Sequence, residues 1–79
     1  MRVLRPELSG SLPVRILDVS KDGLKVLVSR ALDPGSLVQI RREDTVIIGE
    51  VRYSISVGEA HHAGVHIQEA FARKREDKH

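Results

Sequence analysis

The 79-residue sequence contains no cysteine, few aromatic residues and no long apolar run. The lack of cysteine excludes disulfides and thiolate metal sites, and it favours a reducing, cytoplasmic location. Apolar runs reach three residues, as in Val46–Ile48, whereas a membrane-spanning helix needs about 20. We therefore expect a cytoplasmic protein without a membrane span, built as one domain with a thin hydrophobic core.

Positive charge is concentrated at the two ends of the chain. The formal net charge is +2, yet residues 11–71 carry seven Lys or Arg against eight Asp or Glu. A nucleic-acid-binding barrel needs a basic stripe on its folded body and exposed aromatic side chains for base stacking. The aromatic residues here are Tyr53 and Phe71 alone. We therefore predict no nucleic-acid partner, and an oligonucleotide-binding barrel is an alternative that the composition disfavours.

Short alternating apolar segments separated by Gly, Pro and Asp are the main structural signal. This pattern is typical of an all-β sandwich or barrel, and closure into a barrel would remove two exposed sheet edges. The predicted strands cover residues 12–17, 24–29, 37–40, 45–55 and 62–68. We expect a small antiparallel β-barrel of five to six strands over residues 11–70. A flexible N-terminal arm (1–10) would precede it, and a charged C-terminal tail or short helix (71–79) would follow.

A short motif, Asp18-x-Ser20-x-x-Gly23, lies between the first two predicted strands. A carboxylate can accept two N–H groups from one edge of a guanine, and a hydroxyl can donate or accept. A glycine lets a flat ring or a phosphate approach the backbone, or takes the positive φ that a turn often needs. The same residue types also form ordinary turns in which the side chains bond local backbone groups. Spacing alone leaves both interpretations open.

In its context the motif resembles that of the PilZ family, the bacterial receptors for the second messenger cyclic di-GMP. The family pattern D/N-x-S-x-x-G is complete here and follows a similar strand, Val14–Leu17. Further similar segments lie at residues 32–38, 49–53 and 63–67. The resemblance covers roughly residues 5 to 70 and implies a PilZ-like barrel. It also implies that Asp18 and Ser20 read guanine edges, that Gly23 allows close approach, and that cyclic di-GMP is the ligand.

The second motif of that family, R-x-x-x-R, is missing from this sequence. The nearest arrangement is Arg2-Val3-Leu4-Arg5, which is one residue short. In the family the two arginines grip the ligand by phosphate contacts and by stacking on guanine, which suits a planar guanidinium group. The resemblance makes Arg2 and Arg5 candidate ligand-binding residues on an arm that orders on binding. The alternative is that they are solvated terminal charges.

The remaining polar residues do not form a recognisable catalytic or metal site. His62 and His66 share one face of a predicted strand but lie about 13 Å apart along it, too far to bind one metal ion without a bulge. No serine stands in a strand-to-helix nucleophile elbow, and no Gly-rich phosphate loop followed by Lys occurs. We predict no metal site, no catalytic residue and no enzyme activity.

Two hypotheses about function follow. The first is a cyclic di-GMP-binding regulatory module of the PilZ type, which passes its state to a protein partner or to its own oligomer. The alternative is a degenerate PilZ-like barrel that binds no nucleotide and acts as a protein-interaction adaptor. The missing arginine spacing favours the adaptor, which would use an apolar or edge-strand surface for its partner.

Overall fold

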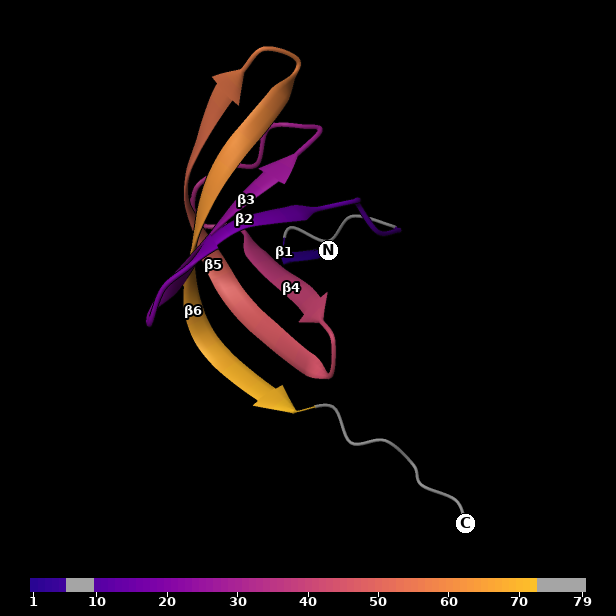
Figure 1. Ribbon diagram of the computed structural model, residues 1–79. Coiled ribbons are helices and arrows are strands. Elements are labelled where there is room, and N and C mark those ends of the chain that lie inside the picture. Colours follow the sequence, from indigo (N-terminus) through magenta and orange to yellow (C-terminus); the bar gives the residue numbers. More distant parts are fainter. Residues whose placement is uncertain (6–9, 73–79) are drawn as a thin grey trace.

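The structure, a computed structural model, describes residues 1–5 and 10–72. These residues form six β-strands and no helix, so the described chain has no helix that could cross a membrane (Figure 1). The strands are β1 (Arg2–Arg5), β2 (Arg15–Val19), β3 (Gly23–Val28), β4 (Leu37–Arg42), β5 (Thr45–Val57) and β6 (Ala60–Ala72). The predicted all-β fold class is confirmed.

All six strands belong to one antiparallel sheet with the order β1-β4-β5-β6-β3-β2. Its centre is the long β5–β6 hairpin. The flanking strands, β4 and β3, pair with only part of its length. β4 pairs with β5 between Thr45 and Glu50, and β3 pairs with β6 between His61 and His66. The upper half of β5 and the lower half of β6 in Figure 1 therefore each have a strand neighbour on one side only, among the residues described.

The sheet is curled, and the chain segments next to its two edge strands meet at one point. Met1 and Leu12 exchange two backbone hydrogen bonds, 2.9 Å from the Met1 amino group and 2.8 Å from the Leu12 N–H. Partial burial lowers the pKa of the Met1 amino group. Beyond this pair, the ladders of the described residues leave β1 and β2 as the edges of an open sheet. The described residues therefore form a curled, open sheet, and the predicted closure into a barrel is not shown.

The core lies on the inner face of the curled sheet, as the alternation of apolar residues predicts. Leu24, Val26 and Val28 are buried on β3, and Ala63 and Val65 are buried opposite them on β6. The other buried apolar residues are Val3, Leu32, Val38, Ile40, Val46, Ile47 and Val51. At about 25 cal/mol per Å² of apolar surface, these small aliphatic side chains supply most of the stabilisation of a domain this size.

Two turns form as their residues predict. Gly35 takes φ 92° after Pro34, and the Ser36 N–H donates to the Asp33 carbonyl at 3.1 Å, which closes the turn before β4. Gly58 takes φ 63° at the first central position of the β5–β6 hairpin turn, where a type II′ turn needs glycine.

The structure corrects the expected boundaries at both ends. Arg2–Arg5 lie in β1 and pair with β4, within the ten residues for which a flexible arm was predicted. At the other end β6 continues to Ala72, with Phe71 opposite Val46, so a helix at residues 71–72 is wrong. The long partner strand β5 extends β6, because each added residue gains a ladder position. Residues 73–79 of the expected tail lie outside the described residues.

Candidate functional site

The motif residues Asp18, Ser20 and Gly23 form the end of β2, the tight connection and the start of β3. The Ser20 N–H donates to the Gly23 carbonyl at 2.8 Å, and the Ser20 hydroxyl donates to the same oxygen at 3.3 Å. One carboxylate oxygen of Asp18 accepts the Val19 N–H at 3.0 Å. Both side chains are exposed, and the Asp18 carboxylate keeps acceptor capacity for a ligand beyond this one bond.

Gly23 allows β3 to pack closely against β6. It does not adopt the positive φ that the sequence suggested. It is absent from the residues with positive φ, and a Cβ atom at this position would lie 2.9 Å from the Val65 carbonyl oxygen. Such an approach to backbone leaves no room for a side chain. The Asp22 carbonyl also accepts the Ile67 N–H at 2.9 Å, which ties the connection to β6. The motif turn is therefore fixed against the centre of the sheet.

A row of directly opposed residues leads from the motif across the outer face of the sheet. Asp18 on β2 lies opposite Lys25 on β3, Lys25 lies opposite Gly64 on β6, and Gly64 lies opposite Tyr53 on β5. The Tyr53 ring lies over Gly64, because a Cβ atom there would overlap the ring carbons. Cross-strand covering of a glycine by an aromatic ring is a recognised way to hold a strand pair. The row places an aromatic face, a cation and a carboxylate on one surface.

A β-bulge adds a second cation to this surface. The β5–β6 register passes from Val51 opposite Val65 to Tyr53 opposite Gly64, so Arg52 is an extra residue on β5. Neighbouring residues of a regular strand face opposite sides, but a bulge redirects a side chain. Arg52 and Tyr53 consequently border the same hollow.

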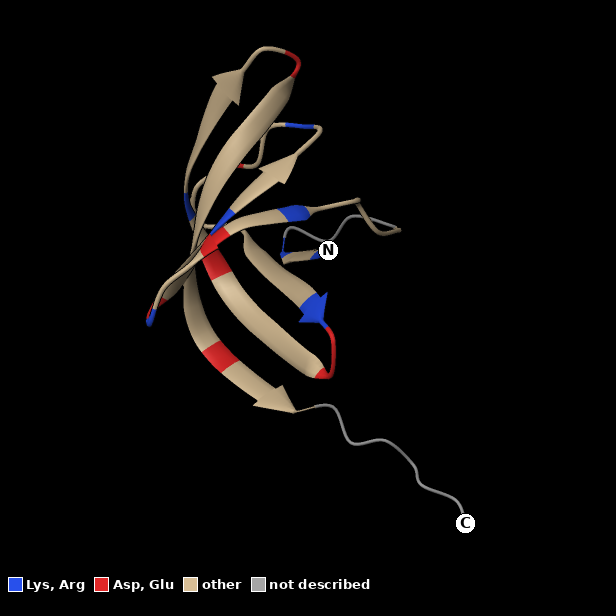
Figure 2. Cartoon of the chain, in the orientation of Figure 1, with Lys and Arg blue, Asp and Glu red and all other residues tan. Residues whose placement is uncertain are grey.

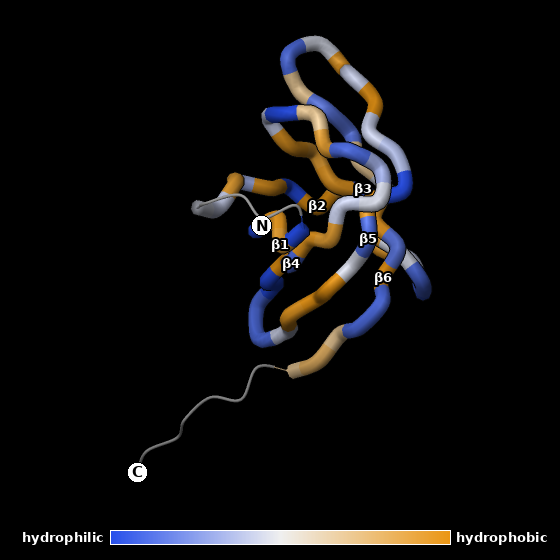
Figure 3. Tube along the Cα trace, turned by 180° about the vertical axis from the view of Figure 1, so that it is seen from behind, coloured by the Kyte–Doolittle hydropathy of each residue, from blue (hydrophilic) through white to orange (hydrophobic). Residues whose placement is uncertain are grey.

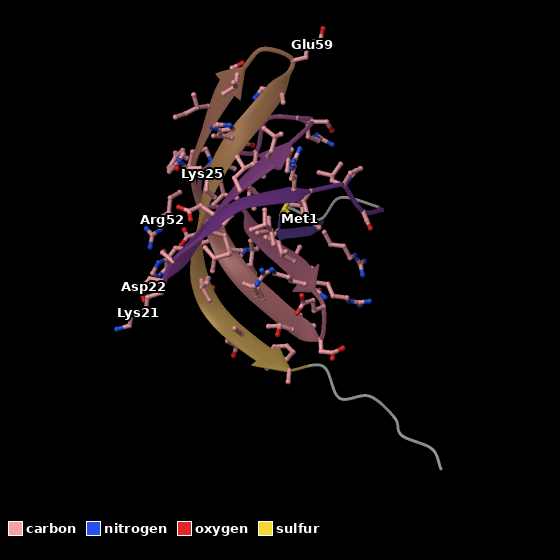
Figure 4. The ribbon with its side chains drawn as sticks, viewed as in Figure 1. Met1, Lys21, Asp22, Lys25, Arg52 and Glu59 are labelled. Atoms are coloured by element: carbon pink, nitrogen blue, oxygen red, sulfur yellow. The ribbon has the colours of Figure 1, made fainter. Side chains whose placement is uncertain are left out.

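The residues of the motif and of this row enclose an open hollow of about 420 Å³. Its lining consists of Asp18, Ser20, Asp22, Gly23, Leu24, Lys25, Arg52, Tyr53, Gly64, Val65 and His66. Figure 4 shows Asp22, Lys25 and Arg52 on one side of the molecule, with the Arg52 side chain directed outward. The hollow is thus lined by carboxylates suited to the edge of a base, by an exposed ring, and by two cations suited to phosphate. Two glycines also line it.

Arg2 and Arg5 are not brought to this hollow. Both lie in β1, whose partner is β4 at the opposite edge of the sheet from β2. The reciprocal bonds between Met1 and Leu12 make the contact between those edges antiparallel. From this contact, β1 and the chain leading to Asp18 run in opposite directions. Figure 4 accordingly shows Met1 and the labelled residue Asp22 on opposite sides of the ribbon.

The sequence did not indicate that Arg52, Tyr53 and Lys25 belong to the site. The alternation of apolar residues shows which face a residue occupies but not which strands lie side by side. One signal was present in the sequence: a glycine flanked by alternating residues in a strand, Gly64, indicates a close approach by a neighbour. The identity of that neighbour, Tyr53, depends on the register of the β5–β6 hairpin.

Other candidate sites are less favourable for a polar ligand. A second hollow, of about 450 Å³, is lined mainly by apolar residues, among them Val14, Leu27 and Val57. The described residues contain no group of three or more His, Asp or Glu side chains that could hold a metal ion. His61, His62 and His66 are half-buried positions of β6.

Comparison with known proteins gave no match among family models, curated proteins or solved structures. The resemblance to the PilZ family therefore rests on the residues quoted above, of which Asp18, Ser20 and Gly23 meet in one hollow.

Proposed function

We propose that this chain is a regulatory module that binds a guanine-containing cyclic dinucleotide, cyclic di-GMP, in the hollow next to the Asp18–Gly23 motif. The supporting observation is the meeting of Asp18 and Ser20 with the Tyr53 ring and the Arg52 guanidinium around one hollow. Its volume, about 420 Å³, lies within the range of about 300 to 1,000 Å³ typical of small-molecule sites.

The proposed roles follow from the chemistry of each side chain. The Asp18 carboxylate accepts the N–H groups at the edge of a guanine, and the Ser20 hydroxyl adds a donor or acceptor beside it. The exposed Tyr53 ring offers a stacking face, worth about 1–3 kcal/mol per base in single-stranded nucleic-acid sites. Lys25 and Arg52 balance the phosphate charge, Arg52 with a planar, bidentate group.

The proposal includes a fold and a location. The curled sheet with its Met1–Leu12 contact would be a PilZ-like barrel. Ligand contacts at the β2–β3 connection would make the curved sheet more rigid. A cytoplasmic location remains a prediction from the cysteine-free composition. Arg2 and Arg5 remain part of the proposed site only if ligand binding draws β1 away from β4, so they are tested separately from Arg52.

Calorimetric titration with cyclic di-GMP tests the proposal, with three arginine variants compared. We expect binding by the wild-type chain and by Arg42→Ala, whose exposed arginine ends β4. Arg52→Ala should weaken binding, and Arg5→Ala should leave it unchanged if the hollow alone forms the site. A loss of affinity in Arg5→Ala would show that the N-terminal arginines bind the ligand instead. No heat and no thermal shift with the wild-type chain would reject nucleotide binding.

A second candidate function is an adaptor that binds a protein partner and no nucleotide. The observation in its favour is that the polar groups of the motif are already engaged locally. The Asp18 carboxylate and the Ser20 hydroxyl both bond backbone groups within the turn, as in ordinary Asp and Ser turns. In that case Asp18→Ala would lower the stability of the turn without affecting any ligand.

A further inference from the structure

The upper half of β5 has an edge that no strand covers. β4 ends its pairing at Glu50, and the connection from β3 to β4 contacts β5 at two further places. Val51 exchanges backbone bonds with Gly35 and Ser36, and the Ser54 hydroxyl accepts the Leu32 N–H at 3.2 Å. Within the described chain no backbone partner other than β6 reaches Ile55–Val57.

The backbone groups at this edge are suited to pairing with another strand. Val57 and Ala60 flank a two-residue hairpin turn, where they form a hydrogen-bonded pair. Alternate residues then direct their N–H and C=O groups away from the partner strand. The backbone groups of Ser54 and Ser56 consequently face away from β6, toward the free edge.

The side chains of this edge lack the features that normally prevent strand pairing. Residues 53–58 contain no charge and no proline, and Ile55 and Val57 are 55% and 45% exposed. Figure 2 shows this stretch of β5 without charged residues, and Figure 3 shows apolar positions within it. Exposed edges are usually protected by charges, proline or a covering segment.

The other free edges do carry such charges. β1 has an arginine at each end, Arg2 and Arg5, and β2 contains Arg15 and Asp18. The uncovered part of β6 contains Glu69. Among the described edges, the segment Tyr53–Val57 of β5 is therefore the one without a charged residue, and its pairing is opposed by no like-charge contact.

We propose that the edge Ser54–Val57 of β5 pairs antiparallel with the same edge of a second copy of this chain. The two-fold pairing places the outward residues Ile55 and Val57 of one copy among those of the other. The flanking charges favour this occupant: Arg52 precedes the segment, and Glu59 follows it at the hairpin tip (Figure 4). Antiparallel pairing brings Arg52 of each copy beside Glu59 of the other.

The proposal does not depend on nucleotide binding and is tested without ligand, although Arg52 belongs both to the hollow and to the flank of this edge. Sedimentation velocity of the full chain over a wide concentration range should show a reversible monomer–dimer equilibrium. Ile55→Lys should weaken dimerisation by about tenfold or more, because like charges then oppose each other at the pairing edge. The control is Val19→Lys, since Val19 is similarly exposed (48%) but lies on β2, and it should dimerise normally.

A charge-exchange experiment tests the orientation of the pair. Arg52→Glu places two acidic groups together at each end of the interface, and Glu59→Arg places two basic groups together. Each variant alone should dimerise more weakly, while their equimolar mixture should regain the wild-type association. The matched pair Arg30→Glu and Glu69→Arg changes charge equally at exposed positions elsewhere, and mixing should not affect its association.

Several results would overturn the proposal. These are a wild-type chain that is monomeric at every concentration, a dimer that survives Ile55→Lys, and single charge variants that gain nothing from mixing. Assemblies larger than two would also contradict it, because two-fold pairing of one edge closes at the dimer. Circular dichroism of each variant shows whether the sheet is retained.

Discussion

β5 contributes to two surfaces of opposite character within a few residues. Around Arg52 and Tyr53 it borders a hollow rich in charge and floored by glycine. From Ile55 to Val57 it is uncharged and, among the residues described, has a strand neighbour on one side only. The bulge at Arg52 separates the two, because it redirects one side chain while the regular alternation resumes beyond it. A charged hollow suits a small polar ligand, and a neutral edge suits another strand, so changes in one should leave the other unaffected except at Arg52, which borders the hollow and flanks the neutral edge.

The largest predicted effect concerns the hollow. Asp18→Asn should lower the affinity for cyclic di-GMP by about tenfold to a hundredfold, since a hydrogen bond to a charged group contributes about 1.5–3 kcal/mol. Titration calorimetry measures the change, and Asp33→Asn is the control because Asp33 lies in an exposed turn outside the hollow. Dimerisation should remain at the wild-type level in both variants. If the Asp18→Asn chain binds cyclic di-GMP like the wild type, the Asp18 carboxylate does not recognise guanine.

The next effect concerns the floor of the hollow. Gly64→Ala must displace the Tyr53 ring, so we expect a loss of stability of about 1–2 kcal/mol and weaker ligand binding. In a Tyr53→Ala background the same substitution should cost much less. Urea unfolding of the four chains gives the coupling between the two positions.

Gly23→Ala is the matched control for that cycle. Its added Cβ would meet the Val65 carbonyl oxygen at 2.9 Å, and backbone cannot move aside as a ring can. The penalty of Gly23→Ala should therefore persist in the Tyr53→Ala background. Equal coupling for both glycines would show that the ring over Gly64 has no special role.

The sequence predicted the fold class and most strand positions for clear physical reasons. The alternation of Leu24, Val26 and Val28 correctly predicted the buried face of β3. Asp33-Pro34-Gly35 is a turn sequence because proline restricts φ to the negative values of one turn position, and glycine readily adopts the positive φ of the next. A glycine inside a strand indicates a bulge or a close contact, and Gly49 has both: the register shifts there and a Cβ would meet the His66 carbonyl.

The composition of the site could be predicted only in part. The motif Asp18-x-Ser20-x-x-Gly23 is local, so its three residues lie close together whatever the order of the strands. Arg52 and Tyr53 join them through strand order and a one-residue bulge, which depend on long-range pairing. Arg2 and Arg5 were taken from a resemblance in spacing, and the edge position of β1 separates them from the hollow.

A smaller effect is expected at Lys25, at the centre of the row between Asp18 and Gly64. Lys25→Gln should weaken cyclic di-GMP binding by about twofold to fivefold, because an exposed ion pair contributes about 0.2–1 kcal/mol. The effect should shrink as salt is added, since salt screens exposed charges. Calorimetry at low and high ionic strength measures it, and an effect that does not depend on salt would contradict a phosphate contact.

The smallest effect concerns the contact between the sheet edges at Met1. Burial lowers the pKa of the Met1 amino group below 8.0, its value in an unfolded chain. The unfolded state therefore binds more protons between the two values, so stability should rise with pH through this window and level off above 8.0. Urea unfolding across this pH range tests the slope. Acetylation of the amino group should abolish it, and a slope that acetylation leaves intact would assign it to another group.

The most direct test of the account is to map the amide NMR signals of the chain during titration with cyclic di-GMP. If the hollow binds the nucleotide, the shifts should be concentrated at residues 18–25, 52–53 and 64–66, with small changes in β1 and at Ile55–Val57. Spectra that do not change with ligand, or shifts centred on Arg2–Arg5, would contradict the assignment of nucleotide binding to the hollow.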